Sequence, residues 1–264
     1  MIDVIRIVRQ AVVLGFAELS RVYTWRTWTF GWLMRLLCQV TFYALLGSYL
    51  GDPALTRYVL VGNVVALACM ESTIVVISLA GERALGTLPL LAVAPAGHLP
   101  VYLGRGIQWM ATGLVSSLVA WTVLPPLLGV PLPWPRAAYA IPVIVLVLVT
   151  SYGYGCALAG VALRLRGVEW LVLNFAYGIV MTFGGVNVPV SVWPEPMRVA
   201  IDVLPLVHGL DAVRGVLNGA PVGHVLGLVG IEALVGAGWY LVAWLSMDRL
   251  VSVGRRTGTL DYAG

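Results

Sequence analysis

Tyr139–Leu163 reads YAIPVIVLVLVTSYGYGCALAGVAL and contains no charged residue. A helix that crosses a hydrocarbon layer about 30 Å thick needs about 20 predominantly apolar residues, so this run is long enough to span a membrane. Five other runs meet the same condition. The sequence therefore predicts an all-α integral membrane protein with six transmembrane helices, over Thr27–Leu50, Arg57–Ala80, Val101–Val130, Tyr139–Leu163, Val168–Val186 and Val222–Met247.

The overall composition agrees with this fold class. Of the 264 residues, 60% are hydrophobic and 11% are charged, whereas soluble domains carry roughly 25% charged residues. No polar stretch is long enough to surround a soluble core, so we expect a single transmembrane domain over residues 1–264. Cys38, Cys69 and Cys156 lie in hydrophobic runs without metal-ligand spacing, and we predict that they are reduced and bind no metal.

The basic residues exclude two classes of function. All sixteen are arginine, and a phosphate-binding P-loop requires a lysine, so this chain cannot hydrolyse ATP through a Walker-type site of its own. The arginines are scattered between apolar runs, which does not indicate nucleic-acid binding. The chain also lacks the H-E-x-x-H and G-x-S-x-G motifs, and we predict that it is not an enzyme by itself.

The N-terminal segment has the pattern of a helix that lies in the membrane surface. Apolar residues recur there at steps of three and four, with polar residues on the opposite face. We therefore predict an amphipathic interfacial helix within residues 1–26. The apolar set is Ile5, Val8, Val12, Phe16 and Leu19, and the polar set is Arg6, Gln10 and Arg21.

Arginine placement predicts the orientation of the chain. With a cytoplasmic N-terminus, eleven arginines fall on the cytoplasmic side and four on the other, with Arg35 inside a span. Cytoplasmic loops are enriched in basic residues, so we predict both termini in the cytoplasm. The arginine-only, alanine- and valine-rich usage is associated with GC-rich bacterial genomes, so we expect the chain in a bacterial inner membrane.

The predicted cytoplasmic loop over residues 81–100 begins GERALGTLPLLAVAP. Thr87 can cap a short helix, Pro89 is tolerated in its first turn, and the following leucines offer apolar surface. A short amphipathic helix in this position would give a soluble motor something to push. On physical grounds alone, a turn packed on its own spans is the favoured alternative.

This loop resembles the E-R-x-x-G-T-L-x-x-L-x-x-x-P signature of the type-2 permeases of ABC exporters. A second segment resembles the same family, with FGGVNVP at residues 183–189, Trp193-Pro194, and PLVHGLDAVR at residues 205–214. The resemblance implies two permease copies, identical or not, each docked on a separate subunit that binds ATP and Mg²⁺. Pro89 departs from the pattern, because many members carry an acid there. The resemblance assigns ATPase coupling to Glu82, Arg83, Gly86, Thr87, Leu88 and Pro95.

The resemblance also predicts an external re-entrant helical hairpin over residues 187–221, before the last span. Its prolines divide it into short pieces, and non-helical backbone at membrane depth must be covered by protein or water. His208, Asp211 and Arg214 are spaced by three and share one side of a helix. With Pro205 they are candidates for an external gate, or alternatively for an ion-pair cluster that holds the hairpin.

Charged residues inside the spans are the remaining candidates. At about 1.5 Å of rise per residue, Arg35 and Glu71 lie at similar depth, roughly 12–14 Å from the cytoplasmic face. Because intramembrane charges pair where they can, we predict an Arg35–Glu71 contact, either as a structural strut or as part of the substrate path. Glu232 is a third such residue without an identifiable partner, and Trp28 is a further candidate for the path.

The sequence thus predicts the permease subunit of an ABC exporter that moves an amphipathic drug, natural product or lipid from the cytoplasm or inner leaflet. Export of a polysaccharide or glycolipid is an alternative, in which Tyr23, Trp25 and Trp28 would stack on sugars. A membrane enzyme or a scaffold without transport is an alternative of another class. The substrate and the choice between homodimer and heterodimer stay open.

Overall fold

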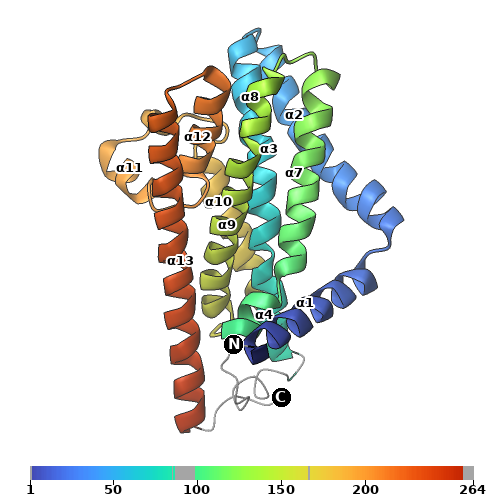
Figure 1. Ribbon diagram of the computed structural model, residues 1–264, viewed down its shortest axis with the longest axis vertical. Helices are drawn as coiled ribbons and strands as arrows, with labels where there is room; N and C mark the ends of the chain where they lie inside the picture. The colour runs from blue at the N-terminus through green and yellow to red at the C-terminus, as the bar shows by residue number, and fades with distance from the viewer. Residues whose placement is uncertain (1, 85, 87–98, 166, 258–264) are drawn as a thin grey trace.

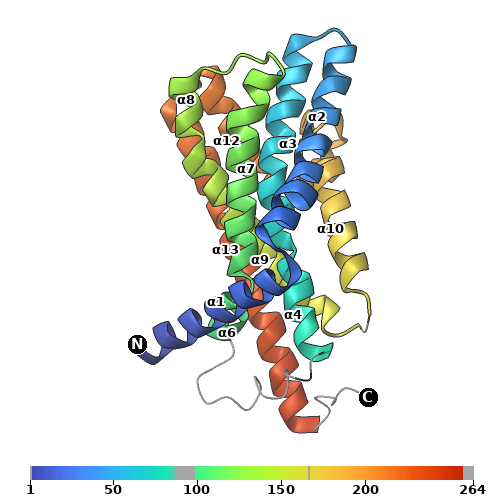
Figure 2. The same cartoon turned by 90° about the vertical axis from the view of Figure 1, so that its right-hand side faces the viewer.

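The computed structural model describes residues 2–84, 86, 99–165 and 167–257, and every regular element in them is a helix (Figures 1 and 2). The prediction of an all-α fold is confirmed for these residues. In chain order the elements are α1 (Ile2–Val22), η1 (Thr27–Leu33), α2 (Met34–Tyr49), α3 (Pro53–Thr73), α4 (Val75–Ala84), α6 (Leu99–Gly104), α7 (Ile107–Leu127), α8 (Trp134–Tyr139), α9 (Ile141–Ala162), α10 (Glu169–Phe183), η2 (Val190–Val192), α11 (Glu195–Ile201), α12 (Val207–Asn218) and α13 (Val222–Thr257).

Five helical stretches in these residues are long and apolar enough to cross a membrane. They coincide with five of the six predicted runs, although the last helix continues past Met247 to Thr257. The sixth run corresponds to α10, whose 15 residues extend about 22 Å, less than the hydrocarbon thickness. The five are Thr27–Tyr49, Pro53–Glu82, Val101–Leu127, Trp134–Ala162 and Val222–Leu250.

The centre of the bundle is formed by α3 and α9. Helix α3 packs against α2, α7 and α9, and α9 packs against α13. In the span that contains α3, 83% of an 18-residue apolar stretch is buried inside the bundle, compared with 28% in the first span and 17% in the last. The two peripheral spans therefore present most of their apolar surface outward.

The bundle has two distinct ends. Helix α1 slants across one end, where α4, α6 and the C-terminal part of α13 also lie, while α8 and α12 lie at the other (Figures 1 and 2). We call these the α1 end and the α12 end. The predicted coupling residues begin in α4, with Glu82 and Arg83, and continue into the segment between α4 and α6, and both of these helices lie at the α1 end.

The amphipathic helix is shorter than the predicted range of residues 1–26. It ends at Val22, and the next helix begins at Trp25. The Thr24 hydroxyl accepts a hydrogen bond from the Thr27 backbone N–H at 3.3 Å, and the Thr24 N–H donates to the Thr27 hydroxyl at 2.9 Å. This reciprocal capping starts a new helix, so Trp25 and Arg26 belong to the helix that leads into the first span and not to the amphipathic helix.

The predicted loop over residues 81–100 is also narrower at its edges. Helix α4 continues to Ala84, and α6 begins at Leu99. Between α3 and α4 the helix is interrupted at Ile74, where the Ser72 and Thr73 hydroxyls donate to carbonyls one turn earlier. Such bonds bend helices, so the second span contains a break that the apolar pattern did not indicate.

At the α12 end, the segment before the last span folds into short helices, as predicted. They are η2, α11 and α12. Helix α11 begins with Glu195 and Pro196, a position where proline is tolerated because the first helical turn needs no backbone N–H donor. Whether this segment re-enters the bilayer stays a prediction.

Candidate functional site

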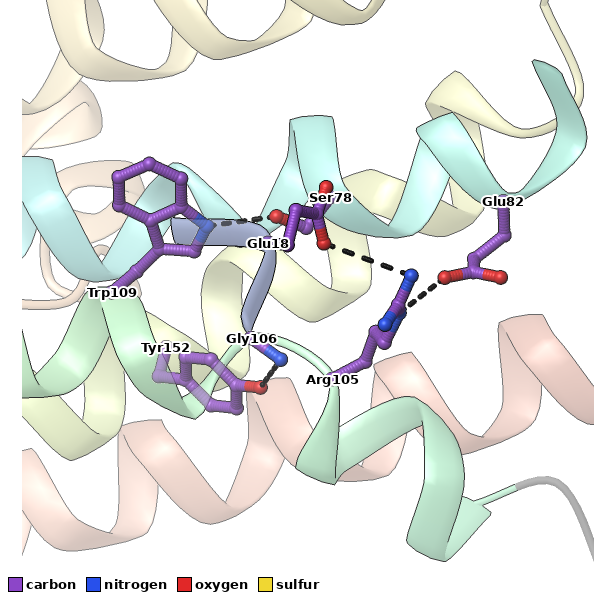
Figure 3. A network of polar contacts seen from close by, with 7 residues as sticks. All are labelled: Glu18, Ser78, Glu82, Arg105, Gly106, Trp109 and Tyr152. Atoms are coloured by element: carbon purple, nitrogen blue, oxygen red, sulfur yellow. Dashed lines mark hydrogen bonds and ion pairs between the residues drawn. The ribbon is translucent and has the colours of Figure 1, made fainter. Parts of the chain in front are cut away.

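Arg105 joins three segments at the α1 end, as Figure 3 shows. It lies in the turn between α6 and α7. Its Nε donates a hydrogen bond to Glu82 Oε1 on α4, and its Nη2 lies 3.6 Å from Glu18 Oε2 on α1. The Arg105 and Glu82 side chains are 16% and 7% exposed, whereas that of Glu18 is 41% exposed. We call these three residues the Arg105 cluster.

The turn that carries Arg105 is fixed from the other side by α9 and α4. The Gly106 N–H donates to the Tyr152 hydroxyl at 3.2 Å, and that hydroxyl donates to the Leu103 carbonyl at 2.6 Å. On α7, Trp109 Nε1 donates to Ser78 Oγ on α4 at 2.8 Å (Figure 3). Together with the Glu18 and Glu82 contacts of Arg105, these bonds attach the turn and the start of α7 to α1, α4 and α9.

Small residues bring α1 against the same turn. A Cβ at Gly104 would lie 2.8 Å from Ala11 Cβ, and a Cβ at Gly15 would lie 2.3 Å from Gln108 Oε1 and 3.1 Å from the Arg105 carbonyl. Neither position has room for a side chain. Helix α1 therefore packs directly on the α6–α7 turn, and a displacement of one element would carry the other with it.

Arg214 makes a comparable junction at the α12 end. Its guanidinium lies 3.4 Å from the centre of the Tyr58 ring, donates to the Tyr58 and Val186 carbonyls at 3.2 and 3.3 Å, and lies 3.7 Å from Asp211. Burial lowers the pKa of Arg214, and its neighbours Tyr58 and Asp211 act in the opposite direction. Arg214 thus holds α12 against α3 and the glycine-rich turn after α10.

Glu232, which had no identifiable partner in the sequence, has three in the structure. It is fully buried on α13 and accepts hydrogen bonds from the Leu206 and Gly209 backbone N–H groups at 3.0 and 2.9 Å, and from the Thr150 hydroxyl at 2.5 Å. The carboxylate therefore caps the N-terminus of α12. Leu206 has a positive φ of 81°, which this cap helps to hold.

The predicted contact between Arg35 and Glu71 is not formed. The Arg35 side chain is exposed and lies 4.6 Å from the centre of the Trp32 ring on its own helix, while Glu71 is fully buried on α3. Equal depth does not bring two residues together, because each also has a direction around its helix axis.

The sequence matches the family of ABC-2 type transporters over residues 13–218. The chain belongs to this family. No curated protein matches it. It is therefore a multi-pass permease of the cell membrane, and the family implies a separate ATP-binding subunit and typically a dimer.

Part of the coupling segment of this ABC-2 permease falls within the described residues. Glu82 belongs to the Arg105 cluster, and Gly86 adopts a positive φ of 68°, which favours glycine. The side chain of Arg83 lies outside the described residues, as do Thr87, Leu88 and Pro95. The coupling role of all six positions stays a prediction.

The four external gate candidates of the permease do not form one ion-pair cluster. Asp211 and Arg214 pair as expected, but His208 Nε2 lies 3.1 Å from the Asp202 carbonyl, and Pro205 is buried. Arg105 and Glu18 were not among the site residues predicted from the sequence. The only available signal was an arginine that interrupts an apolar run, together with an acidic residue in the amphipathic helix.

Proposed function

We propose that this ABC-2 permease is the transmembrane subunit of an exporter that moves an amphipathic drug, natural product or lipid out of the cytoplasm or inner leaflet. ATP and Mg²⁺ would be bound by the separate subunit, which would contact the α1 end. The observation that carries this proposal is the Arg105 cluster, because it links the segment next to the predicted ATPase contact to both α1 and α7.

The arrangement of the ends supports a cytoplasmic α1 end and six crossings. Helix α1 and the C-terminal part of α13 lie at the same end, which requires an even number of crossings (Figures 1 and 2). Five long spans and α10, extended by the residues that follow it, give six. The excess of arginines in the segments at the α1 end is what the cytoplasmic side of a membrane protein shows.

Coupling would proceed through rigid elements. A push on the segment after α4 would reach Glu82, and through Arg105 it would reach the start of α7 and helix α1 together. The two helices would move as one unit because Gly15 leaves no space between them. Tilting α7 and the first span relative to α3 would open a path along the bundle.

A second permease copy is part of this proposal. Helices α2 and α10 are joined by a hydrogen bond from Gln39 Nε2 to the Tyr177 hydroxyl at 2.9 Å. Their outward faces carry large apolar side chains that are exposed in one copy, including Phe42 on α2 and Phe175 on α10. We propose that these faces meet a second copy or membrane lipid.

Cysteine labelling in intact cells tests the orientation. In a Cys38→Ala background, which removes the exposed native thiol, one cysteine is introduced in the predicted cytoplasmic loop between α4 and α6 (Thr87→Cys) and another at the α12 end (Ser191→Cys). A membrane-impermeant maleimide should label Ser191→Cys in intact cells, and Thr87→Cys only after permeabilisation. The reverse pattern would refute the proposal.

An Arg105→Ala variant tests coupling. The tagged chain is purified from its native membranes with the ATP-binding subunit that it retains, and ATPase and transport are measured in proteoliposomes. We expect transport per ATP to fall about 5- to 100-fold, the usual range of coupling between sites. Arg198→Ala, which removes an exposed arginine on α11, is the control. Unchanged coupling in Arg105→Ala, or an active chain without any ATP-binding subunit, would contradict the proposal.

Export of a polysaccharide or glycolipid remains a second candidate for one structural reason. Tyr23, Trp25 and Trp28 line a single pocket, and aromatic rings of this kind can stack on sugars. Transport of a glycolipid but not of an apolar amine by the purified complex would favour this alternative.

A further inference from the structure

Glu71 is a buried carboxylate whose oxygens accept no hydrogen bond of good geometry from the described residues. Its side chain is fully buried in α3, and neither oxygen accepts a hydrogen bond from any described residue. The Ser116 and Thr112 hydroxyls on α7 and the Trp32 indole on η1 face it, but none of them reaches hydrogen-bond geometry. Ser116 Oγ and Trp32 Nε1 are themselves buried without partners among the described residues.

Burying a carboxylate in this way costs free energy unless a hydrogen-bond donor or a cation binds to it. A polar group that is buried without a hydrogen bond destabilises the fold, and an ionised group does so far more. Ionisable residues inside membrane spans are accordingly rare, and they mark substrate or ion pathways. Glu232 shows the contrast, because it is equally buried but accepts three hydrogen bonds.

A surface pocket lies beside this carboxylate, and its wall residues Thr112 and Tyr23 are neighbours of Glu71. It has a volume of about 390 Å³, lies between α1, the start of the first span and α7, and is within the size range of small-molecule sites. Thr112 is common to the pocket wall and to the surroundings of Glu71. Most of the lining is apolar or aromatic, and the polar exceptions are the hydroxyl residues Ser20, Thr24 and Thr112. The other lining residues are Phe16, Leu19, Tyr23, Trp25, Trp28, Ala111 and Val115.

The backbone beside the pocket is also unusual. Residues Thr27–Leu33, which carry Trp28 and Trp32, form a π-helix. π-helical turns are rare and are frequently found at functional sites. Gly113 on α7 allows this helix to pack closely against Glu71 on α3, since a Cβ at Gly113 would lie only 3.1 Å from Glu71 Cβ.

Arg35 forms no ion pair with Glu71. Its exposed guanidinium lies over the Trp32 ring at 4.6 Å, and the two side chains are not within ion-pair distance. Burial raises the pKa of Tyr23 in the pocket, an effect that Arg35 offsets and Glu71 reinforces, which is consistent with both groups lying near Tyr23.

We propose that this pocket binds an amphipathic amine, with Glu71 as the counter-ion of its ammonium group. The inference rests on the proposed function and specifies its substrate class. The apolar body of the ligand occupies the space between α1 and α7, where Tyr23 and Trp28 also offer ring faces to a cation. The ammonium group passes Thr112 and donates hydrogen bonds to both the carboxylate and Ser116.

The chemistry of the pocket disfavours the other ligand classes. An anionic head group would be repelled by Glu71, and a neutral lipid would leave the carboxylate without a donor. A sugar could donate hydroxyl groups, but the lining offers few polar side chains to satisfy the rest of a glycan.

Direct binding tests the proposal without the ATP-binding subunit. The full chain in nanodiscs of zwitterionic lipid is titrated with a fluorescent long-chain primary amine and with its N-acetylated, uncharged analogue. The wild type should bind the amine about 10- to 100-fold more tightly than the analogue, as expected for a charge-assisted hydrogen bond. Glu71→Gln should lose this preference, whereas Glu195→Gln, which removes an exposed carboxylate on α11, should keep it.

Trp28→Leu separates the apolar body from the head group. It should weaken both probes by a similar factor and leave their ratio unchanged. Equal affinity of the wild type for the two probes would overturn the inference, and this result does not depend on whether Glu71→Gln folds. A folded Glu71→Gln variant that still preferred the amine would also overturn it. Because no ATPase is involved, these outcomes are distinct from a failure of the proposed export function.

Discussion

The charged side chains that join elements at the two ends of the bundle are held by different kinds of contact. At the α12 end, Glu232 accepts hydrogen bonds from backbone N–H groups, and Arg214 donates to backbone carbonyls. At the α1 end, Arg105 is held by two carboxylate side chains, one of them 41% exposed. Backbone groups of a helix cannot change rotamer, whereas two long side chains can.

This difference suggests a division of labour. Contacts between side chains can be exchanged at small cost, particularly where water reaches them, which suits an end that transmits movement. Buried contacts to the backbone are costly to break because they leave unsatisfied donors or acceptors. We therefore expect substitutions at the α12 end to affect mainly stability, and those at the α1 end mainly coupling.

Glu232→Ala should have the largest effect on stability. It leaves the Leu206 and Gly209 N–H groups without their acceptor, at a position where Leu206 already has a positive φ, and it removes one of the two acceptors of the Thr150 hydroxyl. We expect a loss of about 2–4 kcal/mol, measured as a lower thermal unfolding midpoint in detergent. Glu232→Gln retains one acceptor oxygen and should lose less. Equal stability of Glu232→Ala and the wild type would show that the cap contributes nothing.

Arg214→Ala should have the next largest effect. The Tyr58 and Val186 carbonyls and the face of the Tyr58 ring would lose their cationic partner. We expect a loss of about 1–3 kcal/mol, by the same thermal measurement. Arg214→Lys keeps the charge but not the planar group, so it should restore only part of the stability. Full restoration by lysine would mean that charge alone matters here.

The sequence was sufficient for the features that depend on composition and local order. Apolar runs located the five long spans, the N-terminal periodicity located α1, and spacing by three anticipated the Asp211–Arg214 pair. These signals arise from residues that are neighbours along the chain.

The sequence was insufficient where partners meet through the fold. Glu232 is completed by backbone N–H groups, which leave no side-chain pattern to recognise. Arg105 and Glu18 are brought together by the packing of α1 on the α6–α7 turn. The Arg35–Glu71 prediction used depth but had no information about rotation around the helix axes, and this missing coordinate made it wrong.

Glu18→Gln should have the smallest effect on stability and provides the sharpest contrast with Glu232. Its Oε2 lies 3.6 Å from Arg105 Nη2, and the Glu18 side chain is 41% exposed. Exposed ion pairs contribute about 0.2–1 kcal/mol to stability. Thermal unfolding should therefore change little, and the difference from the wild type should shrink further at high salt because the pair is screened.

Coupling should respond differently from stability in this variant. Arg105 keeps its hydrogen bond to Glu82, so movement should still reach α7, while the link to α1 is weakened. We expect a drop in transport per ATP that is measurable but smaller than that of Arg105→Ala. If Glu18→Gln destabilised the protein as much as Glu232→Ala, the α1 end would be as rigidly built as the α12 end, and the contrast drawn between them would be wrong.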